Sequence, residues 1–257
     1  AGAIGITCQK LGEAEIMSDA GITDILIATN IIGAARSGQL AALQRRTPLK
    51  ICADNPVSLA AYAEAGHAAD RPVNVLVECD TGRKRAGVET PVEAVALAKM
   101  VRDAPRLQFG GLLFYPPSDG WPATQQFLDT AREGLADLGL VPEIISTGGT
   151  PNLVNLGRLE GATEHRAGTC IFNDRMMMAA GVAGIDDCAL KIFTSVVSRG
   201  GDKRGILDAG SKTFTSDTGG LDGFGLILEH PEARIHNMAE EHGFLDLSDC
   251  ERPPAVG

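Results

Sequence analysis

Hydrophobic and polar positions alternate along the first two thirds of the chain in a way that predicts repeated strand–helix units. Short apolar runs rich in Ile, Leu and Val are separated by longer amphipathic stretches, which is the pattern of βα units around a parallel sheet. Seven of these runs are predicted to be strands: Ile4–Cys8, Asp24–Thr29, Leu49–Asp54, Val73–Asp80, Phe109–Tyr115, Glu143–Thr147 and Thr163–Arg166.

Helix start and stop signals lie between the first six of these runs. A glycine follows three of the helical patterns, where helices commonly end: Leu11–Ala20 before Gly21, Pro56–Ala65 before Gly66, and Ala123–Leu138 before Gly139. Prolines stand where a first helical turn tolerates a missing N–H, at Pro56, Pro91 and Pro122. The sequence therefore predicts an α/β fold, a (β/α)8 barrel of the TIM type.

A barrel of this type closes with eight parallel strands, and an unclosed sheet of seven would expose two edges. We therefore expect one strand to be missing. Because the chain begins directly on a strand-like run, we place the missing first strand before Ala1.

The pattern changes after about residue 185, where short β-type runs follow one another without intervening helices. This change predicts a barrel domain over residues 1–185 and a C-terminal β-rich domain over residues 186–257. The chain ends on a segment that resembles the middle of a turn, so we expect this second domain to be incomplete. Its predicted strands are Leu190–Ser198, Gly205–Ala209, Phe224–Leu228 and Phe244–Leu247.

Composition narrows the class of protein. The 257 residues are 44% hydrophobic and 22% charged, and no apolar run approaches the roughly 18 residues of a membrane span. The formal net charge of -10 argues against a nucleic-acid partner. Six cysteines are spread singly and no export signal is visible, so we expect reduced thiols and a cytoplasmic location.

Two glycine-containing loops follow the last two predicted barrel strands. They hold Thr147, Gly148, Gly149 and Thr150 in the first, and Arg166, Gly168 and Thr169 in the second. Barrels of this type commonly bind phosphate in these two loops, because glycine lets the backbone N–H groups approach the anion closely. The alternative is a pair of tight turns with helix caps.

Polar residues also follow other predicted strands, at Gln9, Asn30, Asp54, Asp80 and Tyr115. The two aspartates are also explained as helix caps or turn formers. Arg83, Lys84 and Arg85 lie close together beside one strand end, which suits a ligand with anionic groups. A solvated run of charges is the alternative interpretation.

Five motifs give the chain a family resemblance. They are DTGRKRAG at residues 80–87, TGGTP at 147–151, RAGT at 166–169, DAGSK at 208–212 and EEHG at 240–243. Together, in this order, they resemble the D-threonine aldolase and D-serine dehydratase group of the alanine racemase-like, fold-type III enzymes that use pyridoxal 5'-phosphate (PLP).

The resemblance implies roles for particular residues. Thr147–Thr150, Gly168 and Thr169 would hold the cofactor phosphate, and Tyr115 would lie by the pyridine ring. Arg85 would reach the phenolic oxygen of the cofactor or the substrate carboxylate. Arg166 would face the pyridine nitrogen, as in related racemases. Gln9 would lie near the cofactor, and His242, in the EEHG motif, would point toward the active site.

The chain departs from the family in two ways. The family's Schiff-base lysine would precede Ala1, and we expect neither Lys10 nor Lys212 to replace it. The family's His-x-Cys metal site would follow Gly257, so no metal ligand is assigned within the chain, although a divalent metal, Zn or Mn, is expected in the intact enzyme.

The resemblance implies a PLP- and metal-dependent lyase that cleaves D-threonine-like 3-hydroxy amino acids to glycine and an aldehyde, with the present chain expected to be a fragment lacking the lysine. The alternatives are a D-serine or D-3-hydroxyaspartate dehydratase, an amino-acid racemase, and a non-catalytic PLP-binding protein if the chain is complete. The expected partners are a small D-amino acid and a second copy of the chain in a homodimer, with no nucleic acid and no membrane.

Overall fold

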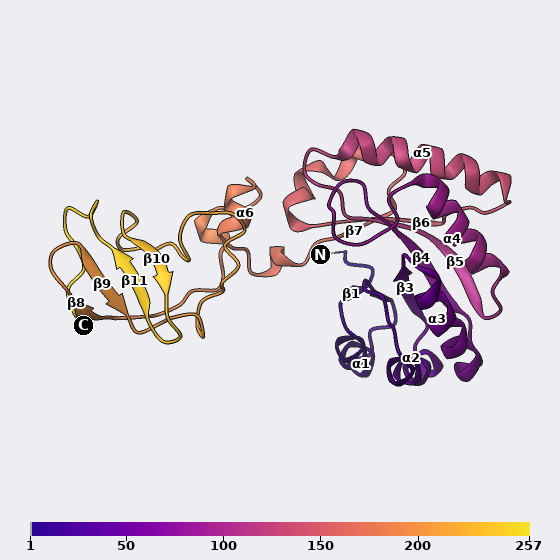
Figure 1. Ribbon diagram of the computed structural model, residues 1–257, viewed down its shortest axis with the longest axis horizontal. Helices are drawn as coiled ribbons and strands as arrows, with labels where there is room; N and C mark the ends of the chain where they lie inside the picture. The colour runs from indigo at the N-terminus through magenta and orange to yellow at the C-terminus, as the bar shows by residue number, and fades with distance from the viewer. Residues whose placement is uncertain (1) are drawn as a thin grey trace. The chain divides into compact units, whose positions relative to one another are not determined.

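The computed structural model describes residues 2–257, which form two compact units, one ending at Ala167 and one beginning at Gly168 (Figure 1). The first unit holds a seven-stranded parallel sheet whose strands follow one another in chain order. All seven predicted strands are present, with their ends shifted by a few residues. They are β1 (Ile6–Cys8), β2 (Ile25–Ile27), β3 (Leu49–Ala53), β4 (Val73–Cys79), β5 (Leu107–Phe114), β6 (Ile144–Gly148) and β7 (Glu164–Arg166).

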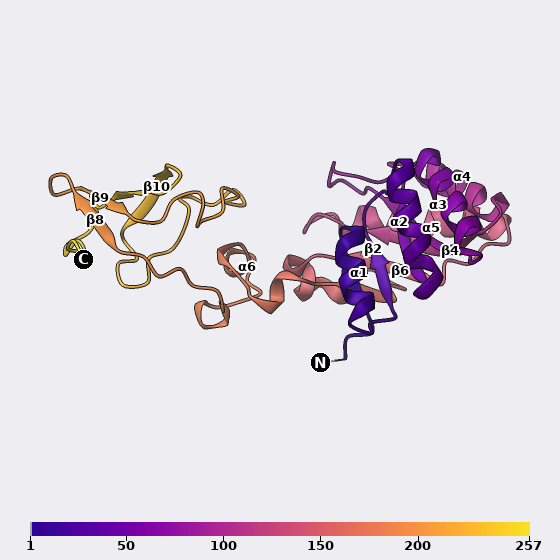
Figure 2. The same ribbon diagram turned by 90° about the horizontal axis from the view of Figure 1, so that it is seen from below.

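Helices lie on the outer face of this sheet (Figures 1 and 2). A large apolar core fills the space between the helices and the sheet, and Ile51, Tyr62 and Leu128 are fully buried within it. The helices are α1 (Leu11–Asp19), α2 (Ala34–Arg46), α3 (Pro56–Ala69), α4 (Pro91–Asp103) and α5 (Trp121–Asp137), and a 3₁₀ helix over Thr150–Arg158 follows β6.

Local sequence signals explain where the helices begin. Asn55, directly before Pro56, is the N-cap of α3. Its side chain accepts a hydrogen bond of 3.0 Å from the Ser58 N–H. In α4, Thr90 and Glu93 form a capping box around Pro91. These caps fix the first turns of the two helices that precede and follow β4. The loop that leaves β4 is thereby held at the start of α4.

The sheet curves into a nearly closed barrel. Lys50 on β3 lies 2.6 Å from the Asp24 carboxylate and 3.9 Å from that of Glu164 on β7. Since β3 and β7 are not neighbours in the sheet, the second contact crosses the barrel interior. A separate cluster of buried residues fills this interior: Leu26, Cys52, Leu76 and Leu113. The prediction of a TIM-type barrel with a separate β domain is thus confirmed.

The second unit contains a four-stranded antiparallel sheet in the order β10-β11-β9-β8, with its own apolar core. Its sheet is preceded by the short helix α6 (Arg175–Ala179). Three of the four predicted strands are found in part. The strands are β8 (Val196–Arg199), β9 (Arg204–Leu207), β10 (Arg234–Met238) and β11 (Gly243–Asp246).

The predicted strand Phe224–Leu228 is wrong. Phe224 and Ile227 pack against the core of this unit from an irregular segment, in which the Phe224 N–H donates to the Ile235 carbonyl. The strand that takes its place, β10, was not predicted because Ile235 is its only fully buried side chain and its other residues are mainly polar or charged. The strand over Phe224–Leu228 was predicted because its apolar residues do pack into the core, but they do so without the ladder of hydrogen bonds that defines a strand.

The division between the units falls at Ala167 and Gly168, whereas the sequence predicted a boundary between residues 185 and 186. The segment that carries α6 accounts for the difference, since it contacts the second unit: Arg175 donates to the carbonyls of Asp222 and Gly223. Among the helices of the described chain, none has the length and apolar character needed to cross a bilayer.

Candidate active site

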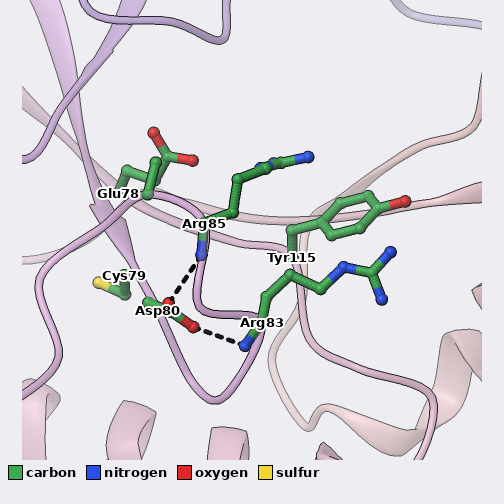
Figure 3. Close-up of a pocket in the computed structure, with 7 residues that line it drawn as sticks. Glu78, Cys79, Asp80, Arg83, Arg85 and Tyr115 are labelled. Atoms are coloured by element: carbon green, nitrogen blue, oxygen red, sulfur yellow. Dashed lines mark hydrogen bonds between the residues drawn. The ribbon is translucent and has the colours of Figure 1, made fainter.

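A small polar pocket lies where β4 and β5 end, which is the end of a parallel barrel that carries active sites. Figure 3 shows the side chains around it, most of them from the loop that leaves β4. The lining residues are Glu78, Cys79, Asp80, Arg83, Arg85, Ala86 and Tyr115.

Asp80 organises the loop over residues 80–87. Its Oδ1 atom accepts hydrogen bonds from the N–H groups of Gly82, at 2.8 Å, and Arg83, at 2.7 Å. Its Oδ2 atom accepts a bond of 3.3 Å from the Arg85 N–H (Figure 3). The Asp80 carboxylate thus faces into the loop, and its charge is offset by backbone donors.

The far end of the same loop is fixed by Asp54, which follows β3. Its Oδ2 atom accepts a bond of 3.0 Å from the Gly87 N–H. Gly87 has a φ of 113°, and a Cβ added there would lie 2.6 Å from the Asp80 backbone nitrogen. The loop therefore requires glycine at this position. Asp80 thus acts as a turn former, which the sequence interpretation included as an alternative, whereas Asp54 joins the end of β3 to this loop.

Tyr115 lies between two guanidinium groups (Figure 3). The Cζ atoms of Arg83 and Arg85 each lie 4.8 Å from the centre of its ring, which is the geometry of cation–π contacts. The structure therefore brings Arg85 and Tyr115 together at the pocket, two residues that the sequence analysis predicted for the site.

The loop after β6 passes directly beneath Tyr115. A Cβ added at Gly148 would lie 3.1 Å from the Tyr115 ring and 2.8 Å from Arg166 Nη2. At Gly149, where φ is 101°, a Cβ would lie 2.8 Å from the Tyr115 hydroxyl. These two positions thus leave no room for a side chain. The Gly149 N–H already donates to the Arg166 carbonyl at 2.8 Å, so it is not a spare donor for an anion.

Arg166, the last residue of β7, is held inside the barrel. Its Nη2 atom donates to the Phe114 carbonyl at 2.9 Å, and its Nη1 atom donates to the Ser146 hydroxyl. Ser146 in turn donates to Glu164 Oε1 at 2.6 Å. Burial lowers the pKa of Arg166 to about 10, although Glu164 and Glu78 favour its charged form.

Glu78 is a pocket residue that the sequence analysis did not single out. Its side chain is buried, and its Oε2 atom accepts a hydrogen bond of 3.3 Å from the Cys52 thiol. Burial, with a contribution from the Asp54 charge, raises the pKa of Glu78, while Arg85 and Arg166 act in the opposite direction. The available signal was a carboxylate at an inward position of a mainly apolar strand.

The Thr147 hydroxyl is engaged away from the pocket. It lies 2.8 Å from Nδ1 of His165 and 3.3 Å from the Glu164 carbonyl, to which it can donate. His165 Nε2 lies 3.1 Å from the Gly149 carbonyl, so the imidazole ring helps to fix the position of the glycine loop. Burial lowers the pKa of His165, and the Arg166 charge adds to this effect. Thr150, which follows, is buried.

Four other predicted site residues are not among those that line the pocket. Gln9 is exposed after β1, and its N–H donates to Glu13 Oε2. Gly168 and Thr169 begin the second unit, and His242 lies in that unit, in the turn between β10 and β11. The roles of these four residues remain predictions.

The EEHG and DAGSK motifs lie against each other within the second unit. The N–H groups of Ser211 and Lys212 donate to the carbonyls of Ala239 and Glu240. A Cβ at Gly210 would lie 2.2 Å from the Ala239 carbonyl oxygen, so the close approach of the two turns requires glycine there. Lys212 also pairs with Glu241 at 2.7 Å. This pairing gives Lys212 a structural role.

No lysine lines the pocket within residues 2–257. Lys50 lies toward the amino end of β3, paired with Asp24, and Lys84 points to Glu89, 3.4 Å away. The same stretch of chain contains no group of three or more His, Cys, Asp or Glu side chains placed to hold a metal ion.

The comparisons with known proteins agree with this architecture. The sequence profile of the alanine racemase N-terminal domain matches residues 1–176, and that of a putative serine dehydratase domain matches residues 189–257. The crystal structure of D-threonine aldolase from Filomicrobium marinum superposes with a TM-score of 0.84 at 29% identity, covering 100% of this chain and 72% of that one. The chain therefore belongs to the alanine racemase-like, fold-type III family.

Two relatives of known activity place the chain more narrowly. The D-threonine aldolase of an Arthrobacter species is 30% identical, over 100% of this chain and 70% of that protein. The D-threo-3-hydroxyaspartate dehydratase of Delftia sp. strain HT23 is 31% identical, over 97% of this chain and 72% of that protein. Within the family, the chain thus belongs to the group of D-3-hydroxy amino acid lyases that contains these two enzymes, as the five motifs predicted.

Proposed function

We propose that this chain carries the PLP-binding barrel of a lyase that cleaves D-threonine-like 3-hydroxy amino acids to glycine and an aldehyde. The observation that carries the proposal is the packing of Tyr115, Arg166 and the Gly148–Gly149 loop at one end of the barrel. The D-threonine aldolase of Arthrobacter, similar along the whole chain, supports the same assignment.

The residues of this end of the barrel fit PLP. Gly148 and Gly149 are buried against Tyr115, in the position where barrels bind phosphate, and the Arg166 guanidinium lies beside Gly148. When bound, PLP supplies an electron sink for the carbanion left by bond cleavage at the substrate. The protein's part is to hold the substrate and to control the charges around the ring.

Particular side chains perform these tasks in the proposed mechanism. Arg85, stacked on Tyr115, binds the substrate α-carboxylate or the phenolic oxygen of the cofactor. Tyr115 would wall the pocket beside the ring of bound PLP. The Arg166 guanidinium, fixed by Phe114 and Ser146, would interact with the ring nitrogen, and its charge would influence whether that nitrogen holds a proton.

A divalent metal is part of the proposed activity but is not assigned to residues of this chain. The C353A mutant of a D-threo-3-hydroxyaspartate dehydratase, 31% identical to this chain, has been solved in a metal-free form. The described residues do not form a site that fits the ion. No step of the mechanism above depends on it.

Dehydration is the second candidate reaction. The Delftia D-threo-3-hydroxyaspartate dehydratase is as similar to this chain as the aldolase is, and one barrel site can serve both reactions. The two differ in the bond that breaks: Cα–Cβ cleavage releases glycine and an aldehyde, whereas loss of water from Cβ leads to a keto acid and ammonia.

A homodimer in the cytoplasm remains part of the proposal, with Glu241 and His242 serving the site of the second copy. The family resemblance supports it. Sedimentation of the protein at micromolar concentration tests the assembly, and a monomer there would contradict it.

The reaction itself is tested by incubating the PLP-loaded protein, with Mn²⁺ or Zn²⁺, with D-threonine, L-threonine and D-threo-3-hydroxyaspartate. Chromatographic detection of glycine and aldehyde from the D substrates alone is the expected result. Keto acid and ammonia would identify the dehydratase instead. Interconversion of D- and L-threonine without cleavage, or an equal rate with both enantiomers, would overturn the proposal.

A further inference from the structure

Arg83 is a second guanidinium at the pocket that the proposed function does not use. It lies as close to the Tyr115 ring as Arg85 does, at 4.8 Å. Within residues 2–257, no carboxylate lies within ion-pair distance of either guanidinium. Lys84, between them, has a φ of 58° and its side chain lies 3.4 Å from Glu89. The left-handed residue thus lets both arginines reach one ring while the lysine points away.

The acidic residues of the pocket do not neutralise this pair. The Asp80 carboxylate faces the backbone N–H groups of its own loop. Glu78 is buried beneath the pocket and accepts a hydrogen bond from Cys52. Neither guanidinium at the pocket forms an ion pair with a described residue, although the Glu78 charge acts on Arg85, and a ligand with two anionic groups complements the two guanidinium groups.

We propose that Arg83 is a specificity-determining residue that binds the side-chain carboxylate of a dicarboxylic D-amino acid, while Arg85 takes the α-carboxylate. This inference rests on the proposed function and names its substrate class: 3-hydroxy amino acids that carry a carboxylate on Cβ, in preference to D-threonine with its methyl group.

The distances fit this assignment. Because each Cζ atom lies 4.8 Å from the same ring centre, the two atoms are separated by no more than twice that distance. The two carboxylate carbons of a four-carbon dicarboxylate lie about 4 Å apart, and each lies about 4 Å from the Cζ atom of a guanidinium that it meets in a forked pair. Such a molecule can span the two guanidiniums around the edge of the Tyr115 ring.

Two amino acids without a 3-hydroxyl group test the idea by binding alone. D-Aspartate carries a carboxylate where D-2-aminobutyrate carries a methyl group, so the ratio of their dissociation constants isolates the contact with the second carboxylate. Calorimetry on the PLP-loaded protein measures this ratio in the wild type, in Arg83→Gln, and in Lys84→Gln. The lysine variant is the matched control, since it removes one positive charge from the adjacent position of the same loop.

Arg83→Gln should weaken D-aspartate binding about tenfold or more and leave D-2-aminobutyrate within twofold, because a charge-assisted contact is lost. Lys84→Gln should preserve the preference for D-aspartate. An unchanged ratio in Arg83→Gln would overturn the assignment, as would weaker binding of PLP itself with the ratio unchanged, since Arg83 would then contact the cofactor phosphate. Failure of the wild type to bind PLP or either amino acid would instead overturn the proposed function, and this inference with it.

Discussion

The guanidinium of Arg166 and the backbone carbonyl of Phe114 are joined by a hydrogen bond of 2.9 Å across the end of the barrel. This bond links the last residue of β7 to the last residue of β5, with β6 between them. Ser146 on β6 accepts a second bond from the same guanidinium. The half-buried guanidinium is therefore fixed from two strands before any ligand arrives, which is the preorganisation that a cofactor site requires.

Ser146→Ala tests the role of this second bond. Loss of the hydroxyl removes the hydrogen bonds that Ser146 makes with Arg166 Nη1 and Glu164 Oε1, so we expect the free energy of unfolding to fall by about 1–2 kcal/mol and PLP to bind several-fold more weakly. Ser37→Ala is the control, because the Ser37 hydroxyl donates to the carbonyl of Gly33, directly before α2, far along the chain from Arg166. Urea unfolding and PLP titration measure both effects. A cofactor affinity that is equal in the two variants would contradict the positioning role of Ser146.

Asp80 gives the second prediction. In Asp80→Ala the N–H groups of Gly82, Arg83 and Arg85 lose their acceptor, so the loop over residues 80–87 should open more often. Amide hydrogen exchange should accelerate at these three positions by an order of magnitude, with Asp80→Asn intermediate because it keeps one oxygen acceptor. Unchanged protection in Asp80→Ala would show that the loop is held by other contacts.

The third prediction concerns acid stability. Burial lowers the pKa of His165 below its ordinary value of 6.5, so the neutral ring is favoured in the folded protein. As the pH falls below 6.5 the unfolded chain takes up the proton first, and the free energy of unfolding decreases. His165→Gln should therefore lose less stability than the wild type between pH 7 and pH 5. Denaturant titrations at both pH values test this, and an equal loss in the two proteins would argue against it.

The lysines of this chain provide the fourth prediction. The pocket lining contains none, Lys50 is paired toward the amino end of β3, and Lys212 is paired with Glu241 in the second unit. Incubation with PLP, reduction with borohydride and peptide mapping should yield no stoichiometric label on Lys10, Lys50, Lys84 or Lys212. A single fully labelled lysine among these four would identify a covalent anchor that the geometry does not predict.

The sequence was sufficient to predict the barrel because each strand is a short apolar run between helix signals, and such runs are buried on both faces in a parallel sheet. It also located Arg85, Tyr115, Gly148, Gly149 and Arg166, which the structure brings together at the end of β5–β7. It failed at Phe224–Leu228, because apolar side chains can fill a core from an irregular segment as well as from a strand.

Other features of the site depend on contacts that no local pattern contains. Glu78 and Ser146 lie inside strand runs, and their partners, Cys52, Arg166 and Glu164, are 18 to 26 residues away along the chain. Thr147 matched the loop motif, yet its hydroxyl meets His165 because alternate residues of a strand face opposite sides. Spacing alone identified the glycines and could not assign the direction of each neighbouring side chain.

In the proposed function, the loops that contain Gly148 and Gly168 hold the cofactor phosphate. The PLP dissociation constants of three glycine variants test this role most directly. Gly168 has a φ of -118° and its added Cβ would meet no atom within 4 Å, so Gly168→Val perturbs the fold little and reports on the ligand. Gly148→Val fills the space between Tyr115 and Arg166. Gly157→Val, also in open space but in the 3₁₀ helix, is the control.

Calorimetry should show PLP bound about tenfold or more weakly by Gly168→Val, because a branched side chain blocks the approach of the phosphate to the backbone. Gly148→Val should weaken PLP binding by a similar factor, because its side chain displaces Tyr115 or Arg166. Gly157→Val should keep wild-type affinity. Wild-type affinity in both Gly148→Val and Gly168→Val would mean that these loops are ordinary turns, and would contradict the assignment of the cofactor to this end of the barrel.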